Sequence, residues 1–334
     1  MIPKSSLGFR LAIVNPLNLV GEELRTILRE RAIPLMKVEL LDATGTAGGA
    51  LTEVNEEAAY VHEIAEGSLE EIDVAIFCGT PESVDPWISR YEDEGFIAID
   101  LTQPSTVADD GVLVVADLHP EALSSGPRLI VSPHPISVAL SLILGSIERV
   151  AQLELAAASV VEPASSHNQA GIDELLEQTL SVLNVRGIPK KIFDRQLAFN
   201  LYPPPDSVRV EAVVAAQVRT LVRADLGISV AITQGTIFHG HTFAIFIKSS
   251  PSVTRETILE ALAQNDAITV ADDEVSTVEA AGKDQVVVGT VTADPHMPGC
   301  FWIWSACDNL RRGSALNAIL ILEEILGQSE PMAN

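Results

Sequence analysis

The sequence predicts an α/β protein, with a Rossmann-type, doubly wound parallel sheet first and an α+β domain after it. Three observations predict this class. Apolar, β-branched runs alternate with helical patterns and short loops through residues 1–131. The strand-like runs after residue 150 are longer, which is typical of a mixed or antiparallel sheet. The last apolar stretch, 313–326, has helical spacing and requires a hydrophobic surface to cover it.

The first domain is predicted from its buried-strand patterns. These occupy residues 9–14, 38–41, 74–77, 96–100, 112–116 and 129–131. After the first of them, 15–19 reads as a turn. Residues 21–31 then place Leu24, Ile27 and Leu28 at helical spacing. The alternation of strand, helix and short loop is what a doubly wound parallel sheet requires.

The second domain is predicted to be α+β. Strand patterns lie at 153–161, 228–233, 241–247, 286–292 and 301–304, and helical patterns at 171–183, 208–222 and 254–264. We therefore expect three parts. These are a dinucleotide-binding-type domain at 1–131, a second domain at 132–307, and a C-terminal segment, 308–334, whose helix returns to the first domain.

Composition restricts the class of protein further. The chain has 334 residues, 47% of them hydrophobic, which is incompatible with a disordered chain. Its net charge of −25 argues against a nucleic-acid or anionic-membrane partner. We expect neither a membrane span nor a secretory signal. The three cysteines, Cys78, Cys300 and Cys307, suggest core packing in a reducing, cytoplasmic compartment.

The turn Ser132-Pro133-His134-Pro135 joins a β-branched run to an apolar helical segment. A strand end that leads into a helix is where α/β enzymes often place reactive groups. Pro135, however, has neither a thiol nor a backbone N–H. The position therefore resembles a nucleophile turn that lacks its nucleophile.

Several segments, in order, resemble the aspartate-semialdehyde dehydrogenase family. They are the tail 306–318, the segment 280–289 (similar to a late hairpin), Ala198-Phe199-Asn200 followed by Pro203, the helix start 170–175, and Gly240-His241. The chain is most similar to the Usg-like, non-catalytic paralogues of that family. The resemblance extends over nearly the whole chain, and it is more specific for fold than for activity.

The resemblance implies a nucleotide-binding first domain and a second domain that holds the active site and the homodimer interface. The family reaction, part of amino-acid biosynthesis, is the NADP-dependent reductive dephosphorylation of an acyl phosphate to a semialdehyde. It needs a thiolate that forms a thioacyl-enzyme and a histidine that acts as acid and base. Cationic groups hold the substrate carboxylate and phosphate.

Most of these groups are replaced here. The family's cysteine corresponds to Pro135, its glutamine to Glu162 and its carboxylate-binding arginine to Gln234, while His241 keeps the base position. Other anchors fall near Val213, Gln217 and Thr106. We therefore expect loss of dehydrogenase chemistry and a binding or interaction role. The alternative is an enzyme with altered chemistry, in which His241 and Glu162 form an acid/base pair.

The cofactor turn is altered as well. Where the family has Gly-x-x-Gly-x-x-Gly, this chain has Asn15, Pro16, Leu17, Asn18, Leu19, Val20 and Gly21. By resemblance, Gly79 and Thr80 would face a ribose and Asn309 a nicotinamide. NADP is the family's cofactor, but Pro16 removes a donor and Leu17 adds bulk, which argues against binding.

Two further expectations concern ligands. His134, His167, His239 and His241 with Glu162 have side chains that zinc accepts, yet ordinary loop residues explain them better, so no metal is expected. A homodimer is expected from the resemblance. A small anion, a residual nucleotide or a partner protein remains the expected ligand class.

Overall fold

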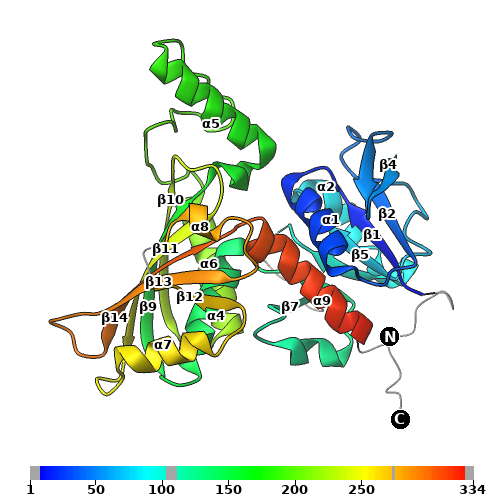
Figure 1. Cartoon of the computed structure of the whole chain (residues 1–334). Coiled ribbons are helices and arrows are strands. Elements are labelled where there is room, and N and C mark those ends of the chain that lie inside the picture. Colours follow the sequence, from blue (N-terminus) through cyan, green and yellow to red (C-terminus); the bar gives the residue numbers. More distant parts are fainter. Residues whose placement is uncertain (1–7, 103–110, 273–274, 328–334) are drawn as a thin grey trace. The chain divides into compact units, whose positions relative to one another are not determined.

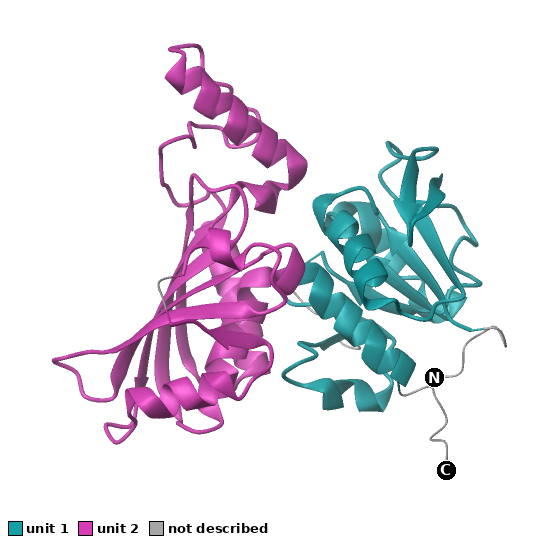
Figure 2. Ribbon diagram, viewed as in Figure 1, with its two compact units in different colours: residues 1–134, 314–334 teal, residues 135–313 magenta. Residues whose placement is uncertain are grey.

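The computed structural model describes residues 8–102, 111–272 and 275–327. The chain divides into two compact units (Figure 2). Unit 1 contains Met1–His134 together with Ser314–Asn334, and unit 2 contains Pro135–Gly313. The C-terminal segment therefore belongs to the first unit, which confirms the predicted return of the last helix.

Unit 1 is built on an eight-stranded sheet with the order β3-β4-β2-β1-β5-β6-β8-β7. Its strands are β1 (Arg10–Val14), β2 (Lys37–Asp42), β3 (Leu51–Val54), β4 (Glu57–Glu63), β5 (Val74–Phe77), β6 (Ile97–Asp100), β7 (Gly111–Leu113) and β8 (Leu129–Val131). All pairings are parallel except that of β3 with β4. This confirms the Rossmann-type sheet.

The helices of unit 1 cover both faces of this sheet (Figure 1). They are α1 (Leu19–Arg31), α2 (Pro81–Ile88), α3 (Tyr91–Glu94), the 3₁₀ turn η1 (Pro120–Ser125) and α9 (Leu316–Gly327). Leu11 and Ile13 of β1 pack with α1 and α9, whereas Ala12 and Val14 pack with α2 and α3. This alternation follows from the period of two along a strand.

The sequence missed the hairpin of β3 and β4 and the helices α2 and α3, and it placed several boundaries wrongly. The hairpin turn is Asn55-Glu56, with φ of 50° and 67°, so it lacks the glycine that normally marks such a turn. The strand predicted at 112–116 ends at Leu113, and α1 begins at Leu19. The last helix begins at Leu316, because a π-turn, Arg311–Ala315, precedes it.

Unit 2 contains a six-stranded mixed sheet with the order β10-β9-β11-β14-β13-β12. Its strands are β9 (Leu153–Glu162), β10 (Gly227–Gln234), β11 (His241–Ser249), β12 (Ile268–Val270), β13 (Val286–Ala293) and β14 (Cys300–Cys307). The helices α4 (Pro135–Glu148), α6 (Ser207–Leu221) and α7 (Arg255–Ala263) pack on one face (Figure 1). The short helix α8 (Thr277–Ala280) lies beside β14. The long strands and mixed pairing confirm the predicted α+β domain.

The other face of the unit 2 sheet is apolar and half-exposed. Trp302 and Trp304 alternate with buried residues along β14 and keep 48% and 39% of their surface exposed. Trp302 packs on Phe246 of β11, with ring centroids 5.2 Å apart. We call Ala244, Phe246, Trp302 and Trp304 the sheet-face patch.

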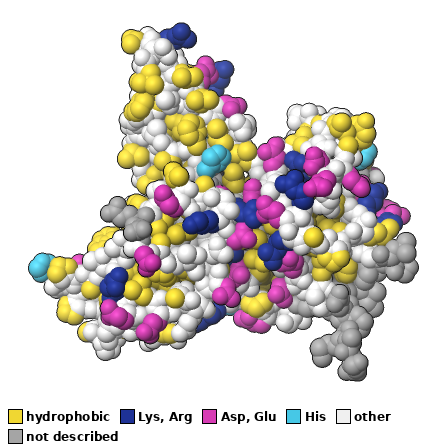
Figure 3. Space-filling view, viewed as in Figure 1, with side chains coloured by type: hydrophobic (Ala, Val, Ile, Leu, Met, Phe, Trp, Pro, Cys, Tyr) yellow, Lys and Arg dark blue, Asp and Glu magenta, His cyan; other side chains and the backbone are white. Residues whose placement is uncertain are grey.

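One helical arm projects from the sheet of unit 2. It consists of the 3₁₀ turn η2 (Ala164–His167), α5 (Asn168–Leu183) and the segment that follows. Hydrophobic side chains gather on this arm at the surface (Figure 3). The buried carboxylate of Glu174 accepts the amides of Lys191 and Ile192, and Gln178 accepts those of Leu197 and Ala198. These contacts fasten the segment to α5.

Candidate functional site

Three of the predicted site residues lie at one end of the unit 2 sheet. Gln234, the last residue of β10, pairs with Glu162, the last residue of β9. His241, the first residue of β11, follows the register that pairs Thr242 with Val161, so it lies level with Glu162. We call Glu162, His167, Gln234 and His241 the strand-end site. Residues 79 positions apart in the sequence therefore lie side by side at one end of the sheet, where these neighbouring strands begin or end.

The carboxyl group of Glu162 has an unusually high pKa. Burial raises its pKa to about 7, and the nearby carboxylate of Asp206 acts in the same direction, while a hydrogen bond with Ser166 opposes them. A carboxyl group with this pKa is partly protonated at neutral pH. It is therefore suited to accept or to donate a proton.

Gln234 is hydrogen-bonded to the backbone of Glu162 on one side and to the side chain of His167 on the other. Nε2 of Gln234 donates to the backbone oxygen of Glu162 over 3.0 Å. Oε1 of the same amide is buried, and the side chain of His167 hydrogen-bonds with Gln234. Burial lowers the pKa of His167, although its hydrogen bond with Gln234 and the charge of Asp206 oppose the shift. The ring of His167 meets that of Phe193 edge to face, with centroids 5.1 Å apart. At neutral pH His167 therefore contributes no cation to the site.

Asn309 holds the loops around the strand-end site together. Its Oδ1 accepts the amide of Gly240 over 2.8 Å, and its Nδ2 donates to Ser165 over 3.0 Å. Gly240 has φ of 84°, and a Cβ there would lie 3.2 Å from Thr277, so this position requires glycine. Asn309 therefore has a structural use within unit 2, although the resemblance assigned it to the cofactor.

Cys307 pairs with His241 across β14 and β11, a proximity that the sequence did not reveal. Burial nevertheless raises the pKa of this thiol to about 12, although Arg312 opposes the shift. Cys78, beside Asp100, has its pKa raised by burial as well. All three cysteines of the chain are buried, as core packing predicts. None of them offers an exposed thiolate.

Pro135 is the first residue of α4. A Cβ built on Gly313, in the π-turn, would lie 2.8 Å from Cβ of Pro135. The proline ring is therefore closely packed by backbone within unit 2. The preceding His134 is half-buried, and burial lowers its pKa to about 4, so it is neutral at pH 7.

The remaining predicted positions contribute no charge to the strand-end site. Val213 and Gln217 lie on α6, where Gln217 is buried. Thr106 lies outside the described residues. Within the described part of the chain, no three His, Cys, Asp or Glu side chains form a group that could hold a metal ion.

The predicted cofactor turn belongs to unit 1, where the side chain of Asn15 fills it. Asn15 has φ of 58°, its Oδ1 accepts the amide of Ala43, and its Nδ2 donates to the oxygen of Cys78, both over 2.8 Å. A Cβ on Gly79 would lie 2.9 Å from Nδ2 of Asn15. The space between the first turn and the end of β5 is therefore taken by this amide. Thr80 follows at the start of α2, where its side chain makes no cap hydrogen bond.

The backbone amides at the start of α1 are also partly occupied by a nearby side chain, that of Asn18. Asn18 accepts the amide of Gly21 over 2.7 Å and so caps the helix. A Cβ on Gly21 would lie 2.6 Å from the oxygen of Pro16, which explains why this glycine is present. Leu17 and Val20 pack against the core cluster beneath α1 and α9, and Leu19 is half-buried.

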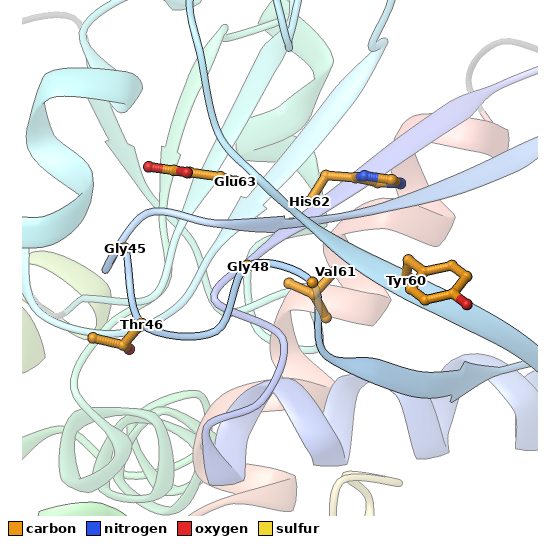
Figure 4. Close-up of a pocket in the computed structure, with 8 residues that line it drawn as sticks. Gly45, Thr46, Gly48, Tyr60, Val61, His62 and Glu63 are labelled. Atoms are coloured by element: carbon orange, nitrogen blue, oxygen red, sulfur yellow. The ribbon is translucent and has the colours of Figure 1, made fainter.

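Asp42, at the end of β2, is the third side chain near this turn whose hydrogen-bonding atoms are already occupied within unit 1. Its carboxylate accepts the amides of Thr44, Ala47 and Gly48 and the hydroxyl of Thr44, which together hold its pKa below the usual range. An acid at this position commonly binds a nucleotide ribose. Here it instead shapes the glycine-rich loop of a shallow pocket of about 350 Å³ (Figure 4).

The turn therefore does not fit a dinucleotide in the usual way. A phosphate cradle needs free backbone amides and close approach, but Asn15, Asn18 and Asp42 already bind the nearby amides. The use of Asp42 and the approach of Asp206 to Glu162 were not found from sequence. Both arise from contacts between separate segments, and the only local signal is an Asp before a predicted helix start.

Comparison with known proteins agrees with the fold. The NAD-binding domain of the semialdehyde dehydrogenases matches residues 11–126, and the dimerisation domain of the same family matches residues 147–312. This chain belongs to the semialdehyde dehydrogenase family.

Aspartate-semialdehyde dehydrogenases and USG-1 protein homologs are both among its relatives. Aspartate-semialdehyde dehydrogenase 2 of Vibrio cholerae is 27% identical over 330 residues, which cover 95% of this chain and 98% of the relative. The USG-1 protein homolog of Pseudomonas aeruginosa is 28% identical over 337 residues, covering 96% and 98%. Among solved structures, aspartate semialdehyde dehydrogenase II of Vibrio cholerae has a TM-score of 0.91 at 26% identity, covering 97% of this chain and 100% of that one. In the described residues, no helix is long and apolar enough to span a membrane.

Proposed function

We propose that this chain is a semialdehyde dehydrogenase homologue that forms no thioacyl-enzyme and uses its strand-end site to bind a small molecule. The observation that carries this proposal is Pro135 at the first residue of α4, packed by Gly313. The side chain of proline is a saturated hydrocarbon ring, so it carries no thiol or hydroxyl that could act as a nucleophile. At this position, the chain therefore lacks the group that attacks the substrate in the family reaction.

The other thiols do not replace the missing one. Cys307 is nearest to the site by strand register, but burial raises its pKa to about 12, so the thiol is protonated at pH 7. It is also almost completely buried, so an aldehyde carbon has no route to its sulfur.

We also propose that NADP, the cofactor implied by the family, is not held by the first turn of unit 1. The support is the occupation of that turn by Asn15 and the use of the Asp42 carboxylate within its own loop. Without a cofactor held at this turn, the chain would have no hydride donor or acceptor there.

A second candidate function is acid/base catalysis on another substrate. The pKa of Glu162, about 7, favours it, because a general acid or base works best near the operating pH. His241, buried beside it at the end of β11, would be the second proton carrier.

We propose a homodimer in which the sheet-face patch is the contact surface. The patch belongs to the segment that matches the family's dimerisation domain, and it exposes two tryptophans. Large exposed apolar patches of this kind commonly mark protein interfaces.

The decisive test is phosphate-dependent reduction of NADP with aspartate semialdehyde, using tagged protein from a host whose own enzyme is deleted. We expect no turnover above a no-protein control. Turnover that rises linearly with the concentration of this chain and survives a second purification step would refute the proposal.

A thiol titration makes the same test without cofactor. We expect no reaction of the native protein with a disulfide reagent within minutes, and three thiols after denaturation. Ser89→Cys, at an exposed position, provides the positive control. One rapidly reacting native thiol in the unmodified chain would contradict the assignment.

A further inference from the structure

We propose that the outer face of α5 is a contact surface for α5 of a second copy of this chain, with the two helices antiparallel about a two-fold axis. This inference rests on the proposed homodimer, since it adds a second contact surface to the same assembly. It is carried by the distribution of apolar, polar and charged side chains along the arm.

The two faces of α5 are inverted relative to those of an ordinary surface helix. Its buried face carries Glu174 and Gln178, which are 5% and 0% exposed and accept backbone amides of the following segment. Its outer face carries Leu176, Leu180 and Leu183, which keep 50%, 52% and 67% of their surface exposed. A surface helix normally turns its apolar stripe toward the core and its polar residues outward. The outer face of α5 therefore has the composition of a contact surface.

The spacing of these leucines fits a second helix. Leu176, Leu180 and Leu183 are separated by four and three residues, so they form one row along α5 with the spacing of a helix–helix seam. Figure 3 shows hydrophobic side chains exposed along this arm. The described part of the chain leaves the row at least half exposed, so its cover comes from outside the chain.

Val185, two residues after the end of α5, extends this apolar row. Its φ of 53° is left-handed, a conformation that glycine normally provides after a helix and that β-branched residues rarely adopt. The residue is nevertheless 94% exposed. A valine here has no use on a free arm, whereas in a helix pair its side chain adds apolar contact area.

Charge complementarity selects a second copy as the occupant. The helix carries the exposed acids Asp173 and Glu177, and the segment after it carries the exposed bases Arg186, Lys190 and Lys191. In an antiparallel pair, the acids of each helix approach the bases of its partner, and a two-fold axis repeats this contact. Because the whole chain carries a net charge of −25, a second copy is repelled unless the contact itself pairs opposite charges.

A cysteine in the middle of the leucine row tests the contact directly. In the antiparallel pair, position 180 of one copy lies near position 180 of the other. The native cysteines are buried, so a short bismaleimide joins introduced thiols. We expect Leu180→Cys to give a covalent dimer at micromolar concentration, and Ser89→Cys, exposed in unit 1, to stay uncoupled. Equal cross-linking of the two variants, or none of Leu180→Cys, would overturn the inference.

Sedimentation equilibrium of the full-length protein measures the contribution of the leucines. Leu180→Glu should weaken the dimer by at least about tenfold, because it places an unpaired charge in the apolar row. Val150→Glu, at a residue of similar exposure in the turn after α4, is the matched control and should change nothing. A circular dichroism spectrum of each variant excludes misfolding.

A charge swap tests the antiparallel arrangement. Reversing Lys190 and Lys191 together to glutamate should weaken the dimer by about threefold or more. Adding Asp173→Lys and Glu177→Lys to that variant should restore the affinity, since each acid then faces a base again. A four-fold variant as weak as the two-fold variant would exclude the antiparallel pairing.

The outcomes separate this inference from the proposed function. A dimer that Trp302→Glu dissociates and Leu180→Glu leaves intact removes the arm contact and keeps the sheet-face patch, and the converse removes the patch alone. Weakening by both variants supports both surfaces, and a monomeric parent protein overturns both. Dehydrogenase turnover or a reactive native thiol refutes the proposed function without affecting the arm contact.

Discussion

Nδ2 of Asn317, in α9, donates a hydrogen bond of 2.9 Å to Oγ of Ser132, at the end of β8. The same amide donates to the oxygen of Val114 and accepts the amide of Ala116. Asn317 is completely buried. The last helix of the chain therefore holds in place the strand end at which the Pro133–Pro135 turn begins.

Asn317→Ala should destabilise unit 1 by about 2–4 kcal/mol, because it leaves two buried backbone groups without partners. Urea unfolding followed by circular dichroism measures the change. Glu324→Ala, at an exposed position on the same helix, is the control and should stay within about 0.5 kcal/mol. A loss below about 1 kcal/mol for Asn317→Ala would show that water replaces the amide.

Asn15 allows backbone conformation to be separated from hydrogen bonding. Asn15→Ala loses the contacts to Ala43 and Cys78 and also places alanine at a φ of 58°. Asn15→Gly loses the same contacts but tolerates that φ. We expect the alanine variant to be less stable than the glycine variant by about 1 kcal/mol. Equal stabilities of the two variants, measured by denaturant unfolding, would argue against strain at this turn.

Glu162→Gln should change how stability depends on pH. The pKa of Glu162 is about 7 in the folded protein and 4.5 when unperturbed, so between these values the folded state binds more protons than the unfolded state. Its contribution to stability therefore falls as pH rises from about 4.5 to 7 and is constant above. The variant should be more stable than the parent at pH 8, by roughly 1–2 kcal/mol after allowance for partial exposure.

The measurement compares unfolding free energies of Glu162→Gln and the parent at pH 5 and pH 8. The difference between the two proteins isolates Glu162 from His167, whose lowered pKa acts in the opposite sense. A difference that does not vary with pH would mean that Glu162 titrates as an ordinary carboxyl. Glu260→Gln, at an exposed acid on α7, should show no such variation.

Trp302→Glu should weaken the proposed homodimer by placing a charge in the centre of the sheet-face patch. We expect a shift from dimer to monomer at micromolar concentration in sedimentation equilibrium, because an unpaired charge at an apolar contact is costly. Val150→Glu alters a residue of similar exposure, 49%, in the turn after α4, and should remain dimeric. A parent protein that is already monomeric would refute the interface.

Much of the candidate site could be predicted because it depends on residue identity. The absence of a thiol at Pro135, the neutral amide at Gln234 and the acid at Glu162 are properties of the chain itself. The strands were predictable where one pattern of burial repeats, as in β5, whose four residues are all buried. The hairpin of β3 and β4 was not, because its residues are mostly exposed and its turn lacks glycine.

The sequence by itself determined the two-domain α/β architecture and the residue types of the candidate site, with proline at position 135 and an amide at position 234. Both follow from local patterns and from single residue types. Only the tertiary structure decided that the Asn15 side chain fills the first turn and that the Asp42 carboxylate hydrogen-bonds to the amides of its own loop. The same holds for the pKa of Glu162, which burial raises to about 7. Those properties depend on hydrogen bonds, burial and charges contributed by distant segments, and a pattern along the chain does not contain them.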